Sequence, residues 1–318
     1  MRLLPHMSEH KVTSSAVAKR AGVSQSAVSR VFTPGASASQ ATTDKVRNAA
    51  AEMGSRPNRL ARSLITGRTR MIGLVVAYLD NQFYPLALER LSQALQARGY
   101  HILVFMAENS TQSVSKVVEE LLDYQVDGII TASVDVTGDL AKRCAQAGIP
   151  IVLFNRGQDE AHLSEVTSDN LAGGRSVAKF LVAGGHKRIV HIAGWQGSST
   201  GRDRSLGFFD ALKELGVHNI TQIDGMYKRD VAAQAARDLF HGPKSPDAVF
   251  VGNDHMAFAV LDVLRLELSL SVPNDVSVVG YDDVPLAAWP SFSLTTVRQP
   301  LDHMVRTTVD LLLGTIED

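Results

Sequence analysis

Four polar residues in one short segment, Gln25, Ser26, Ser29 and Arg30, have the types and spacing of side chains that contact DNA bases. A glutamine amide can form two hydrogen bonds with adenine, and an arginine guanidinium can pair with guanine or hold a phosphate. Serine can bond to several bases. On a helix these four residues share the outer face, because the apolar residues of the segment take the inner one. The segment therefore predicts a helix whose exposed face contacts DNA.

Three short helices are predicted around this segment. A tight turn at Ala21-Gly22-Val23 joins the first two, and two short helices joined by such a turn form a helix-turn-helix. A plain three-helix bundle is the alternative, and geometry alone does not separate the two. The predicted helices and their N-caps are Ser14–Arg20 after Thr13, Gln25–Phe32 after Ser24, and a third helix that follows Thr42 and holds Asp44 in its first turn.

The charge of the chain is divided between a head, residues 1–69, and a body, residues 70–318. Residues 1–70 contain 12 Lys and Arg against 3 Asp and Glu, whereas the remaining residues contain 20 against 30. A basic segment attached to an acidic one is typical of a protein that binds a polyanion. The charge therefore favours a DNA-binding head over the plain bundle.

In the body, from Met71 onward, short apolar strands alternate with amphipathic helices. This alternation predicts parallel sheets, and two successive sets of strands predict two similar lobes. Ligands of such folds bind beyond the carboxyl ends of the strands and between the lobes. The predicted strands are Ile72–Val76, Ile102–Phe105, Gly128–Thr131, Ile151–Phe154, Ile189–Ile192, a strand near Ile220–Ile223, Ala248–Val251 and Val276–Val279.

Amides, carboxylates, guanidinium groups and aromatic rings follow the ends of these strands. Planar polar groups beside aromatic faces suit a ligand with many hydroxyl groups. Asn and Asp after a strand can instead cap the next helix, and we expect that role for Asp169 and Asp254. The segments at strand ends are residues 80–84, Asn155-Arg156, residues 197–204, Asn253-Asp254 and Tyr281-Asp282-Asp283.

Strings in both the head and the body resemble the lactose-repressor (LacI/GalR) family over nearly the whole chain. The resemblance implies an all-α helix-turn-helix head and a two-lobed α/β effector domain, with parallel sheets, similar to periplasmic binding proteins. The strings are Val12-Thr13, Val17-Ala18, residues 21–24, 28–31, 56–58 and 61–64 in the head, and residues 126–128, 168–170, 185–186, Arg204 with Gly207-Phe208, Asn253-Asp254, residues 278–283 and 294–297 in the body.

For the head, the resemblance implies that Gln25, Ser26 and Arg30 contact bases. It also implies that Asn58 to Leu64 form a hinge helix in the minor groove, where Leu64 is a wedge between two base pairs. An apolar wedge unstacks one base step and bends the duplex, which allows wider contact. The candidate DNA-binding residues are Thr13, Ser14, Ser24, Gln25, Ser26, Ser29, Arg30, Asn58, Arg59, Ala61, Arg62 and Leu64.

For the body, the resemblance implies that Arg204, Asn253 and Asp282 occupy effector-binding positions. Thr200 and the pair Phe83-Tyr84 are expected as their neighbours. The candidate effector-binding residues are Asp80, Phe83, Tyr84, Asn155, Thr200, Arg204, Asn253 and Asp282.

These predictions define the organisation and the partners of the chain. We expect a flexible tail at residues 1–10, a helix-turn-helix domain at 11–56, a hinge helix and linker at 57–69, and an effector domain at 70–318. Its N-subdomain covers about 70–166 plus 298–318, and its C-subdomain covers about 167–297. The predicted protein is a homodimeric repressor of sugar-related genes, which binds a near-palindromic DNA operator and a sugar or sugar derivative. Whether that effector weakens or strengthens DNA binding stays open.

Several classes of protein fit the sequence less well. No run of about 18 apolar residues is present, which argues against a membrane span. The first ten residues lack the apolar block of a signal peptide, so we expect a cytoplasmic protein. This, with the basic head, argues against a solute-binding protein of a transport system. The ten histidines show no paired spacing of metal ligands, and we expect no metal or cofactor.

A serine hydrolase is the remaining alternative. Residues 197–201 match the G-x-S-x-G pattern of a nucleophile elbow, with Ser199 as the nucleophile. The elbow requires its serine directly at the turn from strand to helix, and Trp195 and Gln196 lengthen this connection. We therefore expect a ligand-binding loop here and a protein that is not an enzyme.

Overall fold

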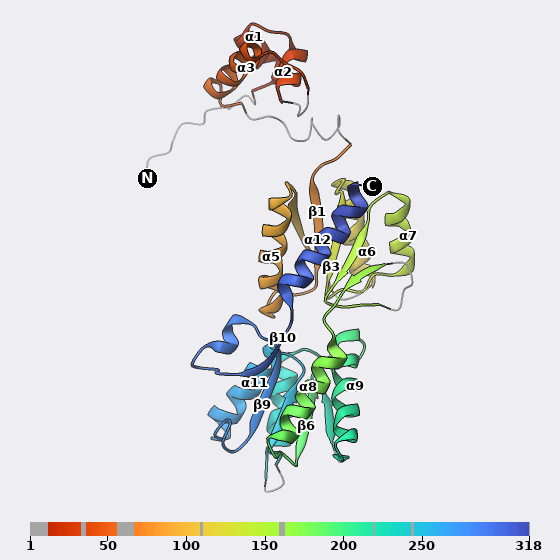
Figure 1. Cartoon of the computed structure of the whole chain (residues 1–318), viewed down its shortest axis with the longest axis vertical. Coiled ribbons are helices and arrows are strands. Elements are labelled where there is room, and N and C mark those ends of the chain that lie inside the picture. The colour runs from red at the N-terminus through yellow and green to blue at the C-terminus, as the bar shows by residue number, and fades with distance from the viewer. Residues whose placement is uncertain are drawn as a thin grey trace. The chain divides into compact units, whose positions relative to one another are not determined.

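The computed structural model describes residues 12–32, 36–55, 67–108, 111–158, 163–218, 220–242 and 245–317. The chain divides into two compact units, the head at residues 1–69 and the body at residues 70–318 (Figure 1). Each unit is described separately. Within the described residues, no helix is both long enough and apolar enough to cross a membrane.

The head contains three helices around a small apolar core. Thr13 caps α1, because its Oγ1 accepts a hydrogen bond from the Ala16 amide at 3.2 Å, and Ser24 caps α2 in the same way through the Ala27 amide at 3.2 Å. Gly22 ends α1 with a left-handed φ of 66°, as the predicted turn requires. The helices are α1 (Ser14–Ala21), α2 (Gln25–Phe32) and α3 (Gln40–Glu52), and the core is Val17, Ala18, Val28, Val46, Ala49 and Ala50.

The third helix begins earlier than predicted, so the expected start after Thr42 is wrong. Ser39 is the N-cap, and its Oγ accepts a hydrogen bond from the Thr42 amide at 3.3 Å. Asp44 therefore lies beyond the first turn, where it accepts a hydrogen bond from Gln40 Nε2 at 2.9 Å. The prediction followed the apolar residues near Val46, whereas the helix starts where a side chain satisfies its first free amides.

The body has two lobes, each with a parallel five-stranded sheet. The strand order is β2-β1-β3-β4-β5 in the first lobe and β10-β9-β8-β6-β7 in the second. The first-lobe strands are β1 (Met71–Val76), β2 (His101–Met106), β3 (Gly128–Ala132), β4 (Ile151–Phe154) and β5 (Ser164–Val166). The second-lobe strands are β6 (Ile189–Ala193), β7 (Thr221–Asp224), β8 (Ala248–Val251), β9 (Ser277–Asp282) and β10 (Thr295–Arg298). The predicted two-lobed α/β fold with parallel sheets is confirmed.

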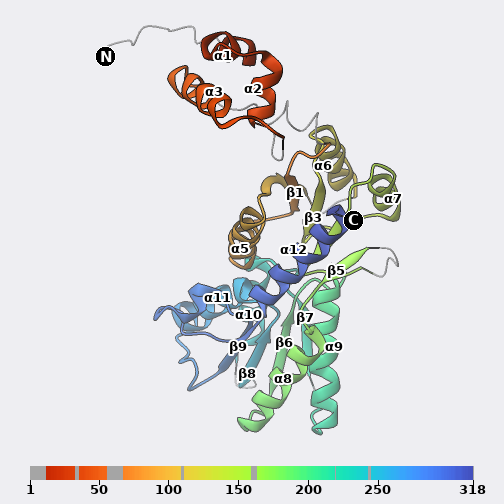
Figure 2. The same ribbon diagram turned by 45° about the horizontal axis from the view of Figure 1, so that its top comes forward.

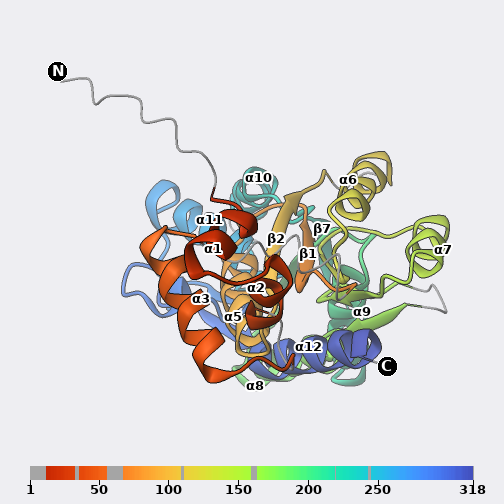
Figure 3. The same cartoon turned by 90° about the horizontal axis from the view of Figure 1, so that it is seen from above.

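Helices cover both faces of each sheet. In the first lobe, α5 and α12 pack on one face and α6 and α7 on the other (Figure 3). In the second lobe, α8 and α9 cover one face and α10 and α11 the other (Figure 2). These helices are α5 (Phe83–Ala97), α6 (Thr111–Asp123), α7 (Gly138–Gln146), α8 (Asn170–Ala183), α9 (Ser199–Glu214), α10 (Arg229–Leu239), α11 (Asp254–Asp262), continued by a π-helical turn over Val263–Glu267, and α12 (Leu301–Glu317).

The described chain passes between the lobes twice. It leaves the first lobe after β5 and enters α8 of the second, and it returns after β10 to α12, which packs against α5. The carboxyl ends of β1, β3 and β4 therefore face those of β6, β8 and β9 across a cleft. The predicted strand-end segments lie on the two sides of this cleft.

Candidate functional site

The outer face of α2 and the residues beside it form a polar surface on the head. All seven described candidates for DNA contact are exposed, whereas Val28 of the same helix is buried. Gln25 Nε2 donates to Ser14 Oγ at 3.0 Å, and the hydroxyls of Ser24 and Ser26 are 2.9 Å apart. Side chains on such a face can reach the edges of bases in a major groove. The seven residues are Thr13, Ser14, Ser24, Gln25, Ser26, Ser29 and Arg30.

The predicted hinge lies outside the described residues. This concerns the candidates Asn58, Arg59, Ala61, Arg62 and Leu64, and the hinge helix and wedge remain predictions.

A small polar cavity lies between the two lobes of the body. It measures about 10 Å³, which is enough for about one water molecule. The first lobe contributes Tyr78, Asn81, Tyr84, Asn155 and Arg156, and the second contributes Thr200, Arg204, Tyr227, Asn253 and Asp282. Six of the eight predicted effector residues therefore meet here. The six are Tyr84, Asn155, Thr200, Arg204, Asn253 and Asp282.

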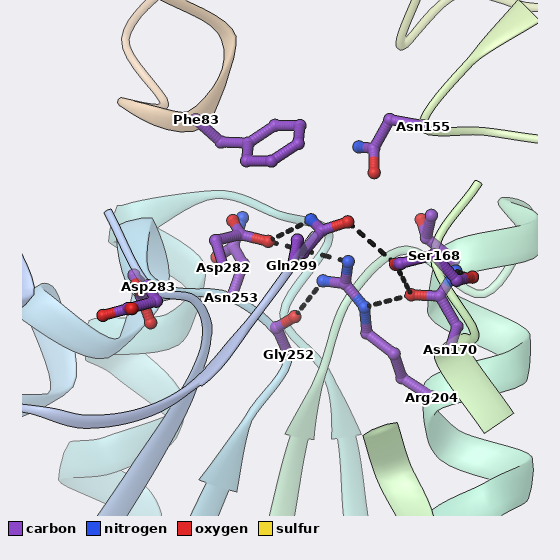
Figure 4. A network of polar contacts seen from close by, with 12 residues as sticks. Phe83, Asn155, Ser168, Asn170, Arg204, Gly252, Asn253, Asp282, Asp283 and Gln299 are labelled. Atoms are coloured by element: carbon purple, nitrogen blue, oxygen red, sulfur yellow. Dashed lines mark hydrogen bonds and ion pairs between the residues drawn. The ribbon is translucent and has the colours of Figure 1, made fainter. Parts of the chain in front are cut away.

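Arg204 and Asp282 form the charged centre of this site. Arg204 Nη2 lies 3.6 Å from Asp282 Oδ1, and only 3% of each side chain is exposed. The Arg204 guanidinium donates to Gly252 O at 2.7 Å and to Asn170 Oδ1 at 2.9 Å (Figure 4). It also lies 3.7 Å from the centre of the Tyr281 ring. A buried charge pair needs such additional partners, because water no longer satisfies its hydrogen bonds.

Gln299 extends this network to the segments that connect the lobes. Its Nε2 donates to Asp282 Oδ1 at 2.7 Å, and its Oε1 accepts from Ser168 Oγ at 2.8 Å (Figure 4). Ser168 precedes α8 and Gln299 precedes α12, so both residues lie where the chain passes between the lobes. The charged centre is thus linked directly to both connections.

Two buried carboxyl groups in the second lobe bind protons more tightly than usual. Burial raises the pKa of Asp282 to about 6, although the charge of Arg204 and the hydrogen bond from Gln299 oppose the shift. Burial, and then the neighbouring Asp282, raise the pKa of Asp254 to about 8. Of the two groups, Asp254 holds its proton to the higher pH, and Asp282 is the carboxylate that pairs with Arg204.

Close packing of α8 on α9 positions Arg204. A Cβ atom at Gly174 would lie 2.2 Å from the backbone oxygen of Arg204, and one at Gly207 would lie 2.1 Å from the Leu171 oxygen. Side chains at these two glycines would separate the helices. The glycines therefore allow the contact between Arg204 on α9 and Asn170, the first residue of α8.

Unusual backbone angles occur at three residues at strand ends, and two of them, Asp282 and Asn155, line the cavity. Asp282 has a φ of 125°, the next residue, Asp283, has a φ of 55°, and Asn155 has a φ of 69°. Residues other than glycine rarely adopt such angles, and in folded proteins they cluster at functional sites. Asn253 serves two purposes, because it lines the cavity and its Oδ1 caps α11 through the Met256 amide at 3.0 Å.

The expected capping roles at strand ends were half right. Asp169 caps α8 by accepting a hydrogen bond from the Ala172 amide at 2.8 Å. Asp254 does not cap α11, because Asn253 has that position. Its buried carboxyl accepts instead from the Val284 amide at 3.0 Å and from Thr296 Oγ1 at 2.5 Å, which connects α11 to β10 and the loop after β9.

The structure does not bring Asp80 and Phe83 into the cavity lining. The Asp80 side chain is 71% exposed and its Oδ2 lies 3.5 Å from His255 Nε2 of the second lobe. Phe83 is 2% exposed, and its ring packs on Tyr84 and Phe154 with centre distances of 5.5 and 6.4 Å. Asp80 thus joins the two lobes, and Phe83 packs against Tyr84, which lines the cavity.

Four cavity residues were absent from the predicted effector set. They are Tyr78, Asn81, Arg156 and Tyr227. The predicted strand-end segments already contained Asn81 and Arg156, and Tyr78 and Tyr227 follow the ends of β1 and β7 within three residues. The prediction kept mainly the positions that the family resemblance implied.

Ser199, the nucleophile of the hydrolase alternative, takes part in a structural contact between the lobes. It is the first residue of α9 after the N-cap Ser198, and its Oγ accepts a hydrogen bond from the Gly157 amide at 2.9 Å. This contact joins the two lobes.

Comparisons with known proteins match both units of the chain. Residues 15–58 match the model of bacterial regulatory proteins of the lacI family, and residues 178–318 match a periplasmic binding protein-like domain. The ribose operon repressor of Escherichia coli (strain K12) is 32% identical over 310 residues, which cover 96% of this chain and 93% of the repressor.

Two solved structures are similar over almost the whole chain. The lac repressor dimer bound to operator and the anti-inducer ONPF matches with a TM-score of 0.85 and 28% identity, over 96% of this chain and 93% of that one. The complex of the transcriptional regulator CelR with cellobiose matches with a TM-score of 0.70 and 33% identity, again over 96% and 93%.

Proposed function

This chain belongs to the lacI family of bacterial regulatory proteins and is a DNA-binding transcriptional regulator, and we propose that it represses sugar-related genes as a homodimer controlled by a small molecule. One observation carries this proposal. A single chain combines an exposed polar face on a helix-turn-helix with a buried polar cavity between two lobes. A solute-binding protein of a transport system would need only the cavity.

The proposal for DNA binding rests on the outer face of α2. Two heads of a dimer would place two such faces on a near-palindromic operator, because a two-fold symmetric protein matches a two-fold symmetric site. Gln25 and Arg30 would contact bases, and the neighbouring hydroxyls would contact bases or phosphates. The similarity to a lac repressor dimer bound to operator supports this arrangement.

The proposal for the effector rests on the chemistry of the cavity. Amide, carboxylate and guanidinium groups between two lobes can bond to several hydroxyls at once, and tyrosine rings provide apolar surface beside them. The names of the relatives point the same way, to ribose for one repressor and to cellobiose for CelR. A sugar or a sugar derivative is therefore the class of ligand that the chemistry of the lining suits, although the lobes must move apart to admit it.

Coupling between the two sites would follow from ligand binding across the cleft. A ligand that contacts both lobes favours one relative orientation of them, and any DNA-binding geometry that depends on this orientation is then linked to the ligand. We infer that the protein does not act as an enzyme, since the matched relatives are repressors. We also infer that it works in the cytoplasm, where its DNA target lies.

The hinge remains part of the proposal. If Leu64 is a wedge between base pairs, Leu64→Ala weakens binding to the operator but leaves binding to random duplex nearly unchanged. Equal losses on both duplexes would show that Leu64 has no such role.

The decisive experiment combines DNA selection with a ligand screen. Full-length protein first selects duplexes from a random pool, and fluorescence anisotropy then measures binding to the selected duplex against random competitor. We expect a preference of at least about 1,000-fold and a strong decrease with salt. A sugar that raises the melting temperature should also change this affinity. Without any duplex preference, with or without sugars, the proposed function is wrong.

A further inference from the structure

A larger cavity lies next to the central one, also between the lobes. It measures about 290 Å³, against about 10 Å³ for the central cavity. Arg156 lines both spaces, so they adjoin at its side chain. The other residues of the larger cavity are Asp135, Gly157 and Gln158 of the first lobe and Gly197, Ser198, Ser199 and Arg202 of the second.

Arg156 is buried between the two cavities, and part of its hydrogen-bonding capacity is unused. Its side chain is 4% exposed. Nη1 donates to Ser133 O at 3.1 Å, and the guanidinium lies 5.5 Å from the centre of the Trp195 ring. Nε is buried and has no hydrogen-bond partner among the residues that the structure describes. A buried guanidinium donor left unpaired is costly, so a ligand that accepts a hydrogen bond there gains free energy.

The residues around the two cavities carry more buried positive than buried negative charge. Arg204 is balanced by Asp282, and each side chain is 3% exposed. Within the described part of the chain, the one acidic side chain paired with Arg156 is Asp135, at 3.6 Å, and that carboxylate is 43% exposed to solvent. Solvent weakens such a pair, so the charge of Arg156 is poorly compensated in this structure.

The larger cavity also borders the N-terminus of a long helix. Ser198 is the N-cap of α9, which has 16 residues, and both Ser198 and Ser199 line the cavity. The amides of a first helical turn and the helix dipole favour an anion at this position. Arg156 approaches the same space from the opposite lobe.

We propose that the effector carries an anionic group, a carboxylate or a phosphate, which binds in the larger cavity between Arg156 and the first turn of α9. The hydroxyl-bearing part of the same molecule contacts Arg204, Asp282 and Asn253 in the central site. The effector is then an acidic sugar derivative rather than a neutral sugar. This inference rests on the proposed function, because it specifies the ligand of the same cleft.

Matched pairs of ligands test the proposal on the full-length protein. Isothermal titration calorimetry compares neutral pentoses and hexoses with their phosphates and with the corresponding aldonic and uronic acids, and inorganic phosphate alone serves as a further probe. We expect at least one acidic member to bind more tightly than its neutral parent, with an affinity that falls as ionic strength rises. The phosphate and acid series distinguish the two sources of negative charge.

The variant Arg156→Gln tests whether Arg156 binds the anionic group of the ligand. The variant should bind the acidic ligand about 10- to 100-fold more weakly, which is the range for loss of one charge-assisted hydrogen bond. Its affinity for the neutral parent should change much less. Arg143→Gln is the matched control, because Arg143 is half exposed on α7 and pairs with Glu119 away from both cavities. Circular dichroism confirms that both variants fold.

Three results would overturn the proposal. They are tighter binding of a neutral sugar than of all its acidic forms, an equal effect of Arg156→Gln on both members of a pair, and no binding by any acidic ligand. If Arg156→Gln does not fold, the comparison of acidic and neutral ligands on the unchanged protein still tests the proposal. DNA binding is measured on the same preparations. Selective binding to a duplex without any preference for acidic ligands would refute this inference and leave the proposed function standing.

Discussion

The head and the body present their functional residues in opposite ways. The seven described candidates for DNA contact on the head are exposed, and four of them, Gln25, Ser26, Ser29 and Arg30, share α2 with the buried residue Val28. In the body, Arg204 and Asp282 are as buried as the core itself. On the head, the side chains proposed for DNA contact are therefore separate from those that stabilise the fold, whereas in the body the side chains proposed to bind the effector also stabilise the fold.

Arg204→Ala should show the largest effect, because it leaves the Asp282 carboxylate buried without its charge partner. We expect a loss of about 3–5 kcal/mol in the free energy of unfolding of the body, and no effector response. Urea denaturation followed by tryptophan fluorescence measures this, since Trp195 and Trp289 both lie in the body.

Arg175→Ala is the control for this variant. Arg175 on α8 pairs with Glu214 of α9, thus joining the same two helices, but both side chains are more than one-third exposed. Such a pair contributes about 0–1 kcal/mol. Equal losses in the two variants would contradict a special role of the buried pair.

A second prediction concerns pH and the buried carboxyl of Asp254. Its pKa is raised to about 8, against about 3.9 for an unfolded chain. Between these values the folded protein holds a proton that the unfolded protein has lost. The free energy of unfolding should therefore fall as pH rises from about 4 to about 8, by up to about 1.4 kcal/mol for each pH unit.

Asp254→Asn should remove part of this slope, because the amide does not ionise. Denaturation by urea at several pH values compares it with Asp169→Asn, which changes an exposed cap. The same slope in the natural protein and in Asp254→Asn would show that this carboxyl does not hold its proton.

On the head, Gln25→Ala should reduce function without reducing stability. Loss of one two-bond contact to adenine weakens specific binding by about 1–3 kcal/mol. The melting temperature of the body should not change. Anisotropy with the selected duplex measures the loss, and Gln40→Ala on α3 is the control, since Gln40 is also an exposed glutamine. A similar loss in both variants would argue against α2 as the recognition helix.

The smallest expected effect comes from the helix caps of the head. Thr13→Ala and Ser39→Ala should each lower the stability of the head by about 1 kcal/mol, because each removes the acceptor for a first-turn amide. Thr42→Ala should cost less, since Thr42 is not the cap. Hydrogen exchange of head amides measures these changes, and a larger loss for Thr42→Ala would contradict the observed start of α3.

The sequence predicted regular elements well where burial produces a clear pattern. All eight predicted strands are present, and the two that were missed, β5 and β10, are short edge strands with exposed residues. An edge strand of three or four residues with little buried surface has no apolar alternation to recognise.

The candidate site was predictable to the level of the strand end, but not to the level of the side chain. Tyr227 was missed although it follows β7 closely. It reaches the cavity because Met226 and Tyr227 both have a left-handed backbone, with φ values of 55° and 57°. Sequence patterns do not reveal such angles at residues other than glycine. The direction of a side chain after a strand therefore came only from the structure.

The bond between Ser168 and Gln299 has a mechanical consequence. It holds the two connections between the lobes next to each other, so the easiest relative motion of the lobes is a swing about a line through that bond. Asp282 is attached to this line through Gln299. A molecule that pulls on the Asp282 carboxylate thus acts close to the pivot, where a displacement of a fraction of an ångström becomes a far larger movement at the distant ends of the lobes.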